Sequence, residues 1–178
     1  MVSPAIYSHL TVLVQCAKPD AHTGPDPEKP RNYINFHAFA ANLFDRRIVH
    51  TNPTWAIWAQ RDAHEGREPY RERQGIPDDI YVLAAAQWIL WYGQSFFKQI
   101  LFPGEVSSDD LRKWRPGPRY HAKAHLALHR WYFWRDGYKA VASSEEKEKG
   151  YSQECKNVAA KAAAMMEALE ENMTFGRF

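Results

Sequence analysis

Residues 81–100, YVLAAAQWILWYGQSFFKQI, form the longest apolar run in the chain, and this run decides the fold. A helix drawn through it is apolar nearly all round, and in a soluble protein such a helix is buried at the centre. Residues 80–97 carry no formal charge, and about 20 apolar residues would cross a bilayer. However, Gln87 and Gln94 would each lose several kcal/mol of hydration in hydrocarbon. We therefore expect a buried helix over about 78–101 rather than a membrane span.

Helical periodicity continues on both sides of this run. Five further helices are expected over about 4–17, 33–43, 55–68, 120–142 and 144–173. Residues 18–31 are proline-rich and form an expected linker, and residues 102–118 form an expected long loop with one short helical turn. A chain of 178 residues buries a sufficient core as one unit. We predict an all-α single domain, residues 1–178, in which five or six helices surround the central one.

Composition narrows the class of protein. The chain has 23 basic and 21 acidic residues, interspersed to a net charge of +2, so it lacks a basic surface for nucleic acid. Cys16 and Cys155 lie far apart and form no C-x-x-C pair, which indicates a reducing compartment. No nucleotide loop, Rossmann fingerprint or nucleophile elbow occurs. We expect a soluble cytoplasmic protein that binds no cofactor, nucleic acid or membrane.

The segment 55–68 is the most informative of the expected helices. Trp55, Trp58, Asp62 and Glu65 fall at i, i+3, i+7 and i+10, so two indoles and two carboxylates share one face. A carboxylate on an apolar face is normally paired, and several arginines, including Arg61, lie nearby. Asp62 is therefore expected either to bridge helices through an arginine or to act as a catalytic carboxylate.

A pocket lined by tryptophans is the first functional hypothesis. The central helix carries Gln87 and Gln94 on one stripe, and Trp88 and Trp91 on another. The glutamines either bond to neighbouring helix ends or line a cavity. The expected substrate-binding residues are Trp55, Trp58, Arg61, Gln87, Trp88, Trp91, Gln94, Trp131 and Trp134.

Such a pocket would bind or transform a flat apolar or aromatic metabolite. Asp62 and His37 are the candidate catalytic residues, and cofactor-free isomerisation, cyclisation or dehydration is the chemistry that they could support. The sequence leaves open whether the protein is an enzyme. In the alternative hypothesis the aromatic residues are ordinary core, and the protein is an interaction or regulatory module. Its methionine-bearing C-terminal helix would then dock a partner or a second copy.

A metal site is the second alternative. His121, His125 and His129 are spaced by four, so consecutive pairs could bind a metal from one side of a helix. The helical wheel turns His125 and His129 away from the tryptophans of the same helix, and no third ligand is evident. The stretch HEGRE, at residues 64–68, lacks the second histidine of a zinc metalloprotease helix.

Four stretches together resemble a known family. They are HAFAANL at 37–43, AIWAQRDAHE at 56–65, LAAAQWILWYGQSFF at 83–97 and RWYFWRDGYKAVA at 130–142. With the alanine- and methionine-rich C-terminal helix, they are similar to uncharacterised fungal proteins known only as a domain of unknown function. The resemblance covers about residues 32–173. It implies a helical intracellular protein of fungal origin and implies no reaction. The chain departs from that pattern at His37, where asparagine is expected, and in the histidine-rich stretch after residue 120.

Overall fold

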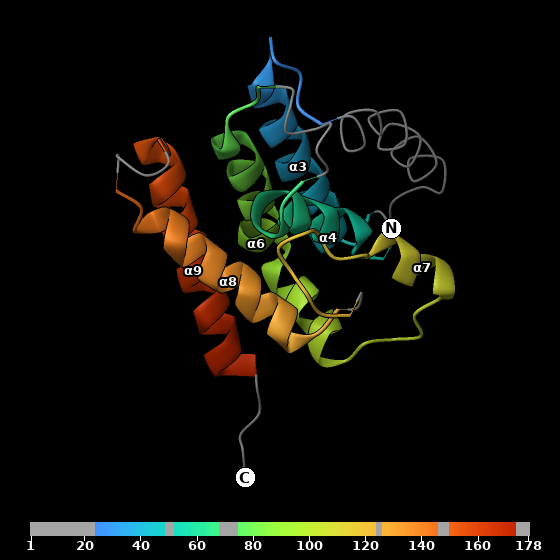
Figure 1. The fold of residues 1–178 in the computed structure, drawn as a ribbon. Helices are drawn as coiled ribbons and strands as arrows, with labels where there is room; N and C mark the ends of the chain where they lie inside the picture. Colours follow the sequence, from blue (N-terminus) through green and yellow to red (C-terminus); the bar gives the residue numbers. More distant parts are fainter. Residues whose placement is uncertain (1–23, 49–51, 68–74, 124–125, 146–149, 174–178) are drawn as a thin grey trace.

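The computed structural model describes residues 24–48, 52–67, 75–123, 126–145 and 150–173. These residues form helices and no strand, which confirms the predicted all-α fold (Figure 1). The helices are α3 (Pro30–Asp45), α4 (Thr54–Gln60), α6 (Asp78–Leu101), α7 (Ser108–Lys113), α8 (Leu128–Ala142) and α9 (Gln153–Met173), with a π-helical turn η1 (Arg61–Glu65) directly after α4. The helix expected over 4–17, which includes Cys16, lies outside the described residues.

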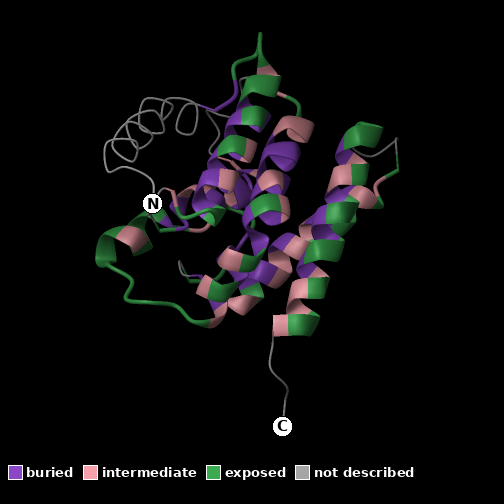
Figure 2. Cartoon of the chain, turned by 180° about the vertical axis from the view of Figure 1, so that it is seen from behind, coloured by how far each residue is buried: buried purple, intermediate pink, exposed green. Residues whose placement is uncertain are grey.

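Helix α6 is the centre of the bundle, and its bounds agree with the prediction of 78–101. It packs against α3, α4, α8 and α9. Most of its length is buried, as the purple segments of the ribbon show in Figure 2. Its N-terminal turn carries Asp78 and Asp79, whose charges complement the helix dipole. In the described part of the chain, no helix has the length and apolarity needed to cross a membrane.

Helix α3 lies along α6 and runs in the same direction. The ring of Tyr33 meets that of Tyr81 near the start of both helices, with centroids 6.0 Å apart. Further along, the ring of Phe44 packs edge-on against Trp88, with centroids 5.1 Å apart. Pro30, placed in the expected linker, instead begins the helix, because proline fits the first turn, where no backbone N–H is needed.

Helices α8 and α9 form the other side of the bundle and lie side by side (Figure 1). Contacts between their side chains show that they run antiparallel. The indole of Trp131 and the guanidinium of Arg135 donate to the two carboxylate oxygens of Glu170, at 3.0 and 2.5 Å, and Lys139 pairs with Glu167. The expected helices over 120–142 and 144–173 are wrong at their beginnings, since α8 starts at Leu128 and α9 at Gln153.

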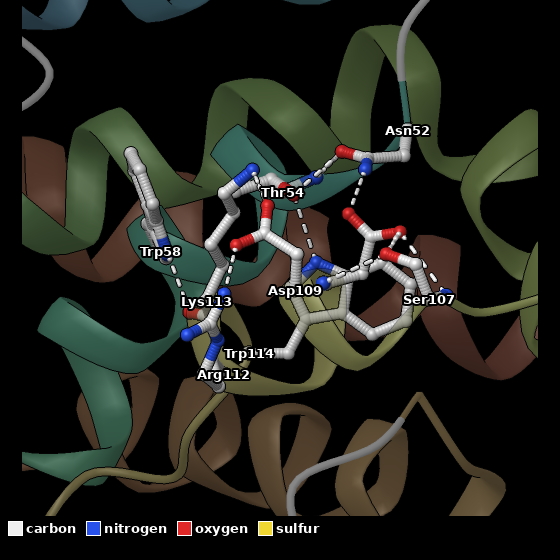
Figure 3. Close-up of polar contacts among 9 residues, drawn as sticks. Asn52, Thr54, Trp58, Ser107, Asp109, Arg112, Lys113 and Trp114 are labelled. Carbon is white, nitrogen blue, oxygen red and sulfur yellow. Dashed lines mark hydrogen bonds and ion pairs between the residues drawn. The ribbon is translucent and has the colours of Figure 1, made fainter.

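The segment expected as a long loop contains α7, which is tied to α4 (Figure 3). The Ser107 side chain accepts the N–H of Asp110, and the Asp110 side chain accepts the N–H of Ser107, which completes a capping box. Asn52 donates to the Asp110 carboxylate at 2.5 Å. The buried indole of Trp114 donates to the Thr54 hydroxyl at 2.8 Å. This anchoring directs the chain after α7 across η1.

Candidate functional site

The site begins at η1, where the helix expected over 55–68 changes from α to π geometry. A π turn adds a residue to the hydrogen-bonded ring and so rotates the residues after it relative to an α-helix. Trp58, which precedes the turn, is half-buried, and its indole donates to the backbone oxygen of Lys113 at 2.8 Å. Glu65 is completely buried. The prediction that these two residues share a face rests on α-helical spacing and does not hold here.

A buried ion pair holds η1 in place. Glu65 and Arg130 of α8 both have 0% exposure. The carboxylate of Glu65 accepts two hydrogen bonds from the Arg130 guanidinium, at 2.7 and 3.0 Å. It also accepts the Trp134 indole N–H at 2.7 Å and the Gly117 backbone N–H at 2.8 Å. Four donors thus replace the water that the carboxylate lost, which makes its burial tolerable.

The same residue holds the loop before α8. The backbone N–H of Arg119 donates to the backbone oxygen of Glu65 at 2.7 Å. A Cβ atom on Gly117 would lie 2.7 Å from that oxygen, so only glycine allows the loop to approach this closely. Glu65 therefore places Arg119 next to η1 through its backbone and Gly117 through its side chain.

A pocket of about 330 Å³ opens between η1, α8 and Tyr151, which lies two residues before α9. Its lining residues are Ala63, His64, Arg119, Gly137, Ala140, Val141, Ser144 and Tyr151. Gly137 lets α8 approach the imidazole, because a Cβ there would lie 2.6 Å from the Nδ1 atom of His64. The volume falls at the lower end of the range of about 300–1,000 Å³ typical of ligand pockets.

His64 is the buried polar residue of the pocket wall. It has 8% exposure, and its ring packs edge-on against Tyr138 with centroids 4.2 Å apart. Tyr138 is fixed in turn, because its hydroxyl donates to the Gln60 side chain at 2.9 Å. The Nε2 atom of His64 is enclosed and has no hydrogen-bond partner. Burial lowers the pKa of His64 to about 3, so the imidazole is neutral at pH 7.

The polar groups of the pocket are suited to binding rather than to proton transfer. A general base works best with a pKa near the working pH, and the pKa of His64 is far below it. Partial burial, reinforced by the charge of Asp78, raises the pKa of Tyr151, so its hydroxyl remains a donor. Near the same helix end, burial raises the pKa of Cys155 to about 12, and its thiol stays protonated.

The predicted catalytic residues lie elsewhere. His37 of α3 is buried, and its Nδ1 atom accepts the indole N–H of Trp88 at 2.7 Å. Burial also lowers the pKa of His37 to about 3. Asp62 of η1 is buried, with the Arg61 Nε atom 3.6 Å from its carboxylate, and its backbone oxygen accepts a bond from Arg67 at 3.0 Å. Neither His37 nor Asp62 lines the pocket.

No tryptophan lines the pocket either. Trp88, Trp131 and Trp134 each have 0% exposure and form part of the core. Trp55 is half-buried against the rings of Phe36 and Phe44, with both centroid distances 5.8 Å. These side chains fill the space between helices, which is the ordinary-core arrangement that the sequence left as an alternative.

The two glutamines of α6 do not line the described pocket. Gln87 is half-buried and donates to the backbone oxygen of Leu83 in its own helix at 3.1 Å. Its side-chain oxygen accepts the indole N–H of Trp91, which is 53% exposed. Gln94 is exposed. The outer stripe of α6 is thus polar and solvated along these positions, and the glutamines bond to no neighbouring helix end that the structure describes.

His121, one of the two histidines proposed as metal ligands, does not lie in a helix. His121 is exposed and precedes α8 by several residues, while His125 lies outside the described residues. The chain folds back instead, because the Tyr120 ring stacks on His129 with centroids 5.8 Å apart and Ala127 is extended. Across the ranges that the structure describes, no group of three or more His, Cys, Asp or Glu side chains could hold a metal ion.

The two buried histidines predict a loss of stability in acid. An unfolded imidazole has a pKa near 6.5, whereas His37 and His64 have values of about 3 in the folded protein. Between these values the unfolded chain binds protons that the folded protein does not. The free energy of unfolding should therefore decrease as the pH is lowered below 6.5, by up to about 1.4 kcal/mol per pH unit for each histidine.

Urea unfolding between pH 7.5 and 4.5 measures this slope. His37→Gln keeps an acceptor for Trp88 and should remove the share of the slope that His37 contributes. His129→Gln, at an exposed position, is the matched control and should leave the slope unchanged. Equal slopes for the wild type and His37→Gln would contradict the assignment.

None of the pocket residues was selected as a site residue from the sequence, including His64, Arg119 and Tyr151, which supply its main polar groups. They come from segments that are far apart in the chain, and the sequence offers only indirect signals for them. Gly66 after the HE pair and the stretch RPGPR at 115–119 mark sharp turns on either side of the pocket. Gly66 has a φ of 90°, a conformation typical of glycine.

Comparison with known proteins gives one match. A family model described as "Protein of unknown function (DUF3632)" matches residues 3–138, well over half of the chain. The match ends within α8, before Ala140, Val141, Ser144 and Tyr151 of the pocket. This confirms the predicted resemblance to a domain of unknown function, although the matched range begins and ends earlier than 32–173. Searches of curated proteins and of solved structures found no match.

Proposed function

We propose that this chain, which belongs to the DUF3632 family of proteins of unknown function, binds a small organic molecule in the pocket beside His64. The observation that carries the proposal is a pocket of about 330 Å³ whose wall contains a buried histidine with an unpartnered ring nitrogen. An unsatisfied buried polar atom costs roughly 1–3 kcal/mol and calls for an explanation. A ligand would supply a partner if its binding moved the pocket wall enough to reach this enclosed nitrogen.

The role that we propose is binding without transformation. The imidazole of His64 is too weak a base at pH 7, and the thiol of Cys155 is protonated and buried. The histidine is instead held rigidly between Tyr138 and Gly137. A neutral imidazole in a fixed position is suited to orienting a ligand by a hydrogen bond.

The pocket suits the ligand class expected from the sequence, although residues other than the tryptophans line it. Ala63, Ala140 and Val141 supply an apolar surface, and the half-buried Tyr151 supplies a flat ring. These groups support binding of a compact molecule with an apolar or aromatic body. The tryptophans contribute indirectly, since the Trp134 indole bonds to Glu65 at 2.7 Å and so supports the turn that carries His64.

An interaction module is less well supported. The large apolar side chains that are exposed occur on several elements, in α3, α6, the α6–α7 connection, α7 and α9: Phe39, Trp91, Phe102, Val106, Leu111 and Met165. Single exposed apolar residues are normal for a globular protein. Docking of a partner or a second copy on α9 remains a prediction.

Filling the pocket should abolish binding. Ala140→Phe adds a ring at an exposed position of α8 that lines the pocket, so the variant should fold but exclude ligands. Ala160→Phe, at an exposed position of α9, is the matched control. We expect at least one member of a panel of small metabolites to bind the wild type and Ala160→Phe in ligand-observed NMR, and to bind Ala140→Phe at least about tenfold more weakly. A panel with no such member would refute the proposal.

A further inference from the structure

We infer that the ligand is a small monocarboxylate whose anionic group pairs with Arg119. The inference rests on the proposed function and names the class of molecule that the pocket takes. Among the lining residues that the structure describes, Arg119 is the one that carries a charge, and none of them is a carboxylate. Its guanidinium forms no ion pair with the residues that the structure describes.

The position of Arg119 is fixed by the fold. Its backbone N–H bonds to the oxygen of Glu65, which directly follows His64 in η1. The next residue, Tyr120, bonds through its own N–H to Gly117 at 3.1 Å. The short turn that carries the Arg119 side chain is therefore held against η1, which forms one wall of the pocket. A guanidinium is charged at all working pH values and presents paired N–H groups that match a carboxylate.

The remaining polar groups complement an acceptor. The Tyr151 hydroxyl is protonated at pH 7, because its pKa is raised, and it is free to donate. The neutral His64 imidazole carries one N–H. Among the acids that raise the pKa of Tyr151, Asp78 has the largest effect, and its own carboxylate pairs with Arg67, which offsets its charge. The pocket thus combines donors with one uncompensated cation, and a carboxylate can accept several such bonds at once.

The size and the apolar wall restrict the rest of the molecule. The surface formed by Ala63, Ala140 and Val141 is suited to a hydrocarbon body. A volume of about 330 Å³ is at the small end for ligand pockets and leaves little room for a nucleotide or a large cofactor. With Arg119 as the one cation among the described lining residues, the second charge of a phosphate ester would lose water without gaining a partner, so a single negative charge is matched better.

Matched pairs of ligands test the inference. Benzoate with benzamide, and hexanoate with hexanamide, differ in charge but little in shape, and phenyl phosphate tests the more highly charged alternative. Titration calorimetry should show at least about tenfold tighter binding of each acid than of its amide. Arg119→Gln should remove this preference. Arg115→Gln, at an exposed arginine outside the pocket lining, should retain it.

The outcomes separate the two proposals. If Ala140→Phe blocks binding of amides and acids alike, and Arg119→Gln changes neither, the pocket is a binding site and the carboxylate assignment is wrong. Tighter binding of phenyl phosphate than of benzoate would also overturn that assignment. If no probe loses affinity in Ala140→Phe, the proposed function itself fails. Because Arg119 and Arg115 are both exposed, near-ultraviolet circular dichroism should be the same for both variants and the wild type.

Discussion

Replacing Arg130 by leucine should lower the free energy of unfolding by about 3–5 kcal/mol. The Glu65 carboxylate would remain buried at 0% exposure but would lose two of its four hydrogen bonds and the positive charge that pairs with it. The backbone oxygen of Trp114 would also lose the bond that the guanidinium donates at 2.8 Å. A buried charge without its partner is far more costly than the intact pair is stabilising. Urea unfolding followed by circular dichroism measures the loss.

An exposed ion pair offers the matched control. Arg31 and Glu154 also form a two-bond pair, at 3.0 and 2.7 Å, but both side chains are largely exposed. Arg31→Leu should leave the unfolding midpoint almost unchanged, since water replaces the lost partner. The prediction would be wrong if Arg130→Leu were no more destabilised than Arg31→Leu. Agreement would show that Glu65 and Arg130 hold η1 and the loop that carries Arg119.

The central helix was predictable because its signals are local. The apolar residues of α6 occur nearly all round the helix, and its bounds are set by Pro77 in front and by Pro103 and Gly104 behind. The start of α8 was not predictable in this way. Residues 120–127 have a helix-compatible composition, yet packing of Tyr120 on His129 turns the chain back before the helix begins. Tertiary contacts here override local propensity.

The site was less predictable than the fold for a similar reason. Spacing along an α-helix indicated that Asp62 would be buried and paired with an arginine, and Asp62 is buried with the Arg61 Nε atom 3.6 Å from its carboxylate. The same spacing did not single out Glu65, which is completely buried. The π turn changed the relevant face, and the partner Arg130 lies 65 residues further along the chain. Periodicity carries no information about such a distant partner. The pocket joins three separate segments, so its lining could not be derived from any one of them.

Truncation of two tryptophans of α6, three residues apart, should change the free energy of unfolding by very different amounts. Trp88→Ala should lower the free energy of unfolding by about 3–5 kcal/mol, because it opens a cavity in the middle of the core. Trp88 has 0% exposure, packs against Phe44 and Tyr92, and donates to His37 at 2.7 Å. Truncation would therefore also leave the acceptor nitrogen of a buried histidine unpaired.

Trp91→Ala is the control on the same helix, since Trp91 is 53% exposed and its indole bonds only to Gln87 one turn earlier, at 3.2 Å. Its loss should change the free energy of unfolding by less than about 1 kcal/mol. Comparable losses in the two variants would mean that the outer face of α6 is covered in solution, and the division of this helix into a core side and a solvent side would be wrong. A large loss for Trp88→Ala alone would show that the tryptophans stabilise the fold from within, while ligand binding depends on the pocket beside His64.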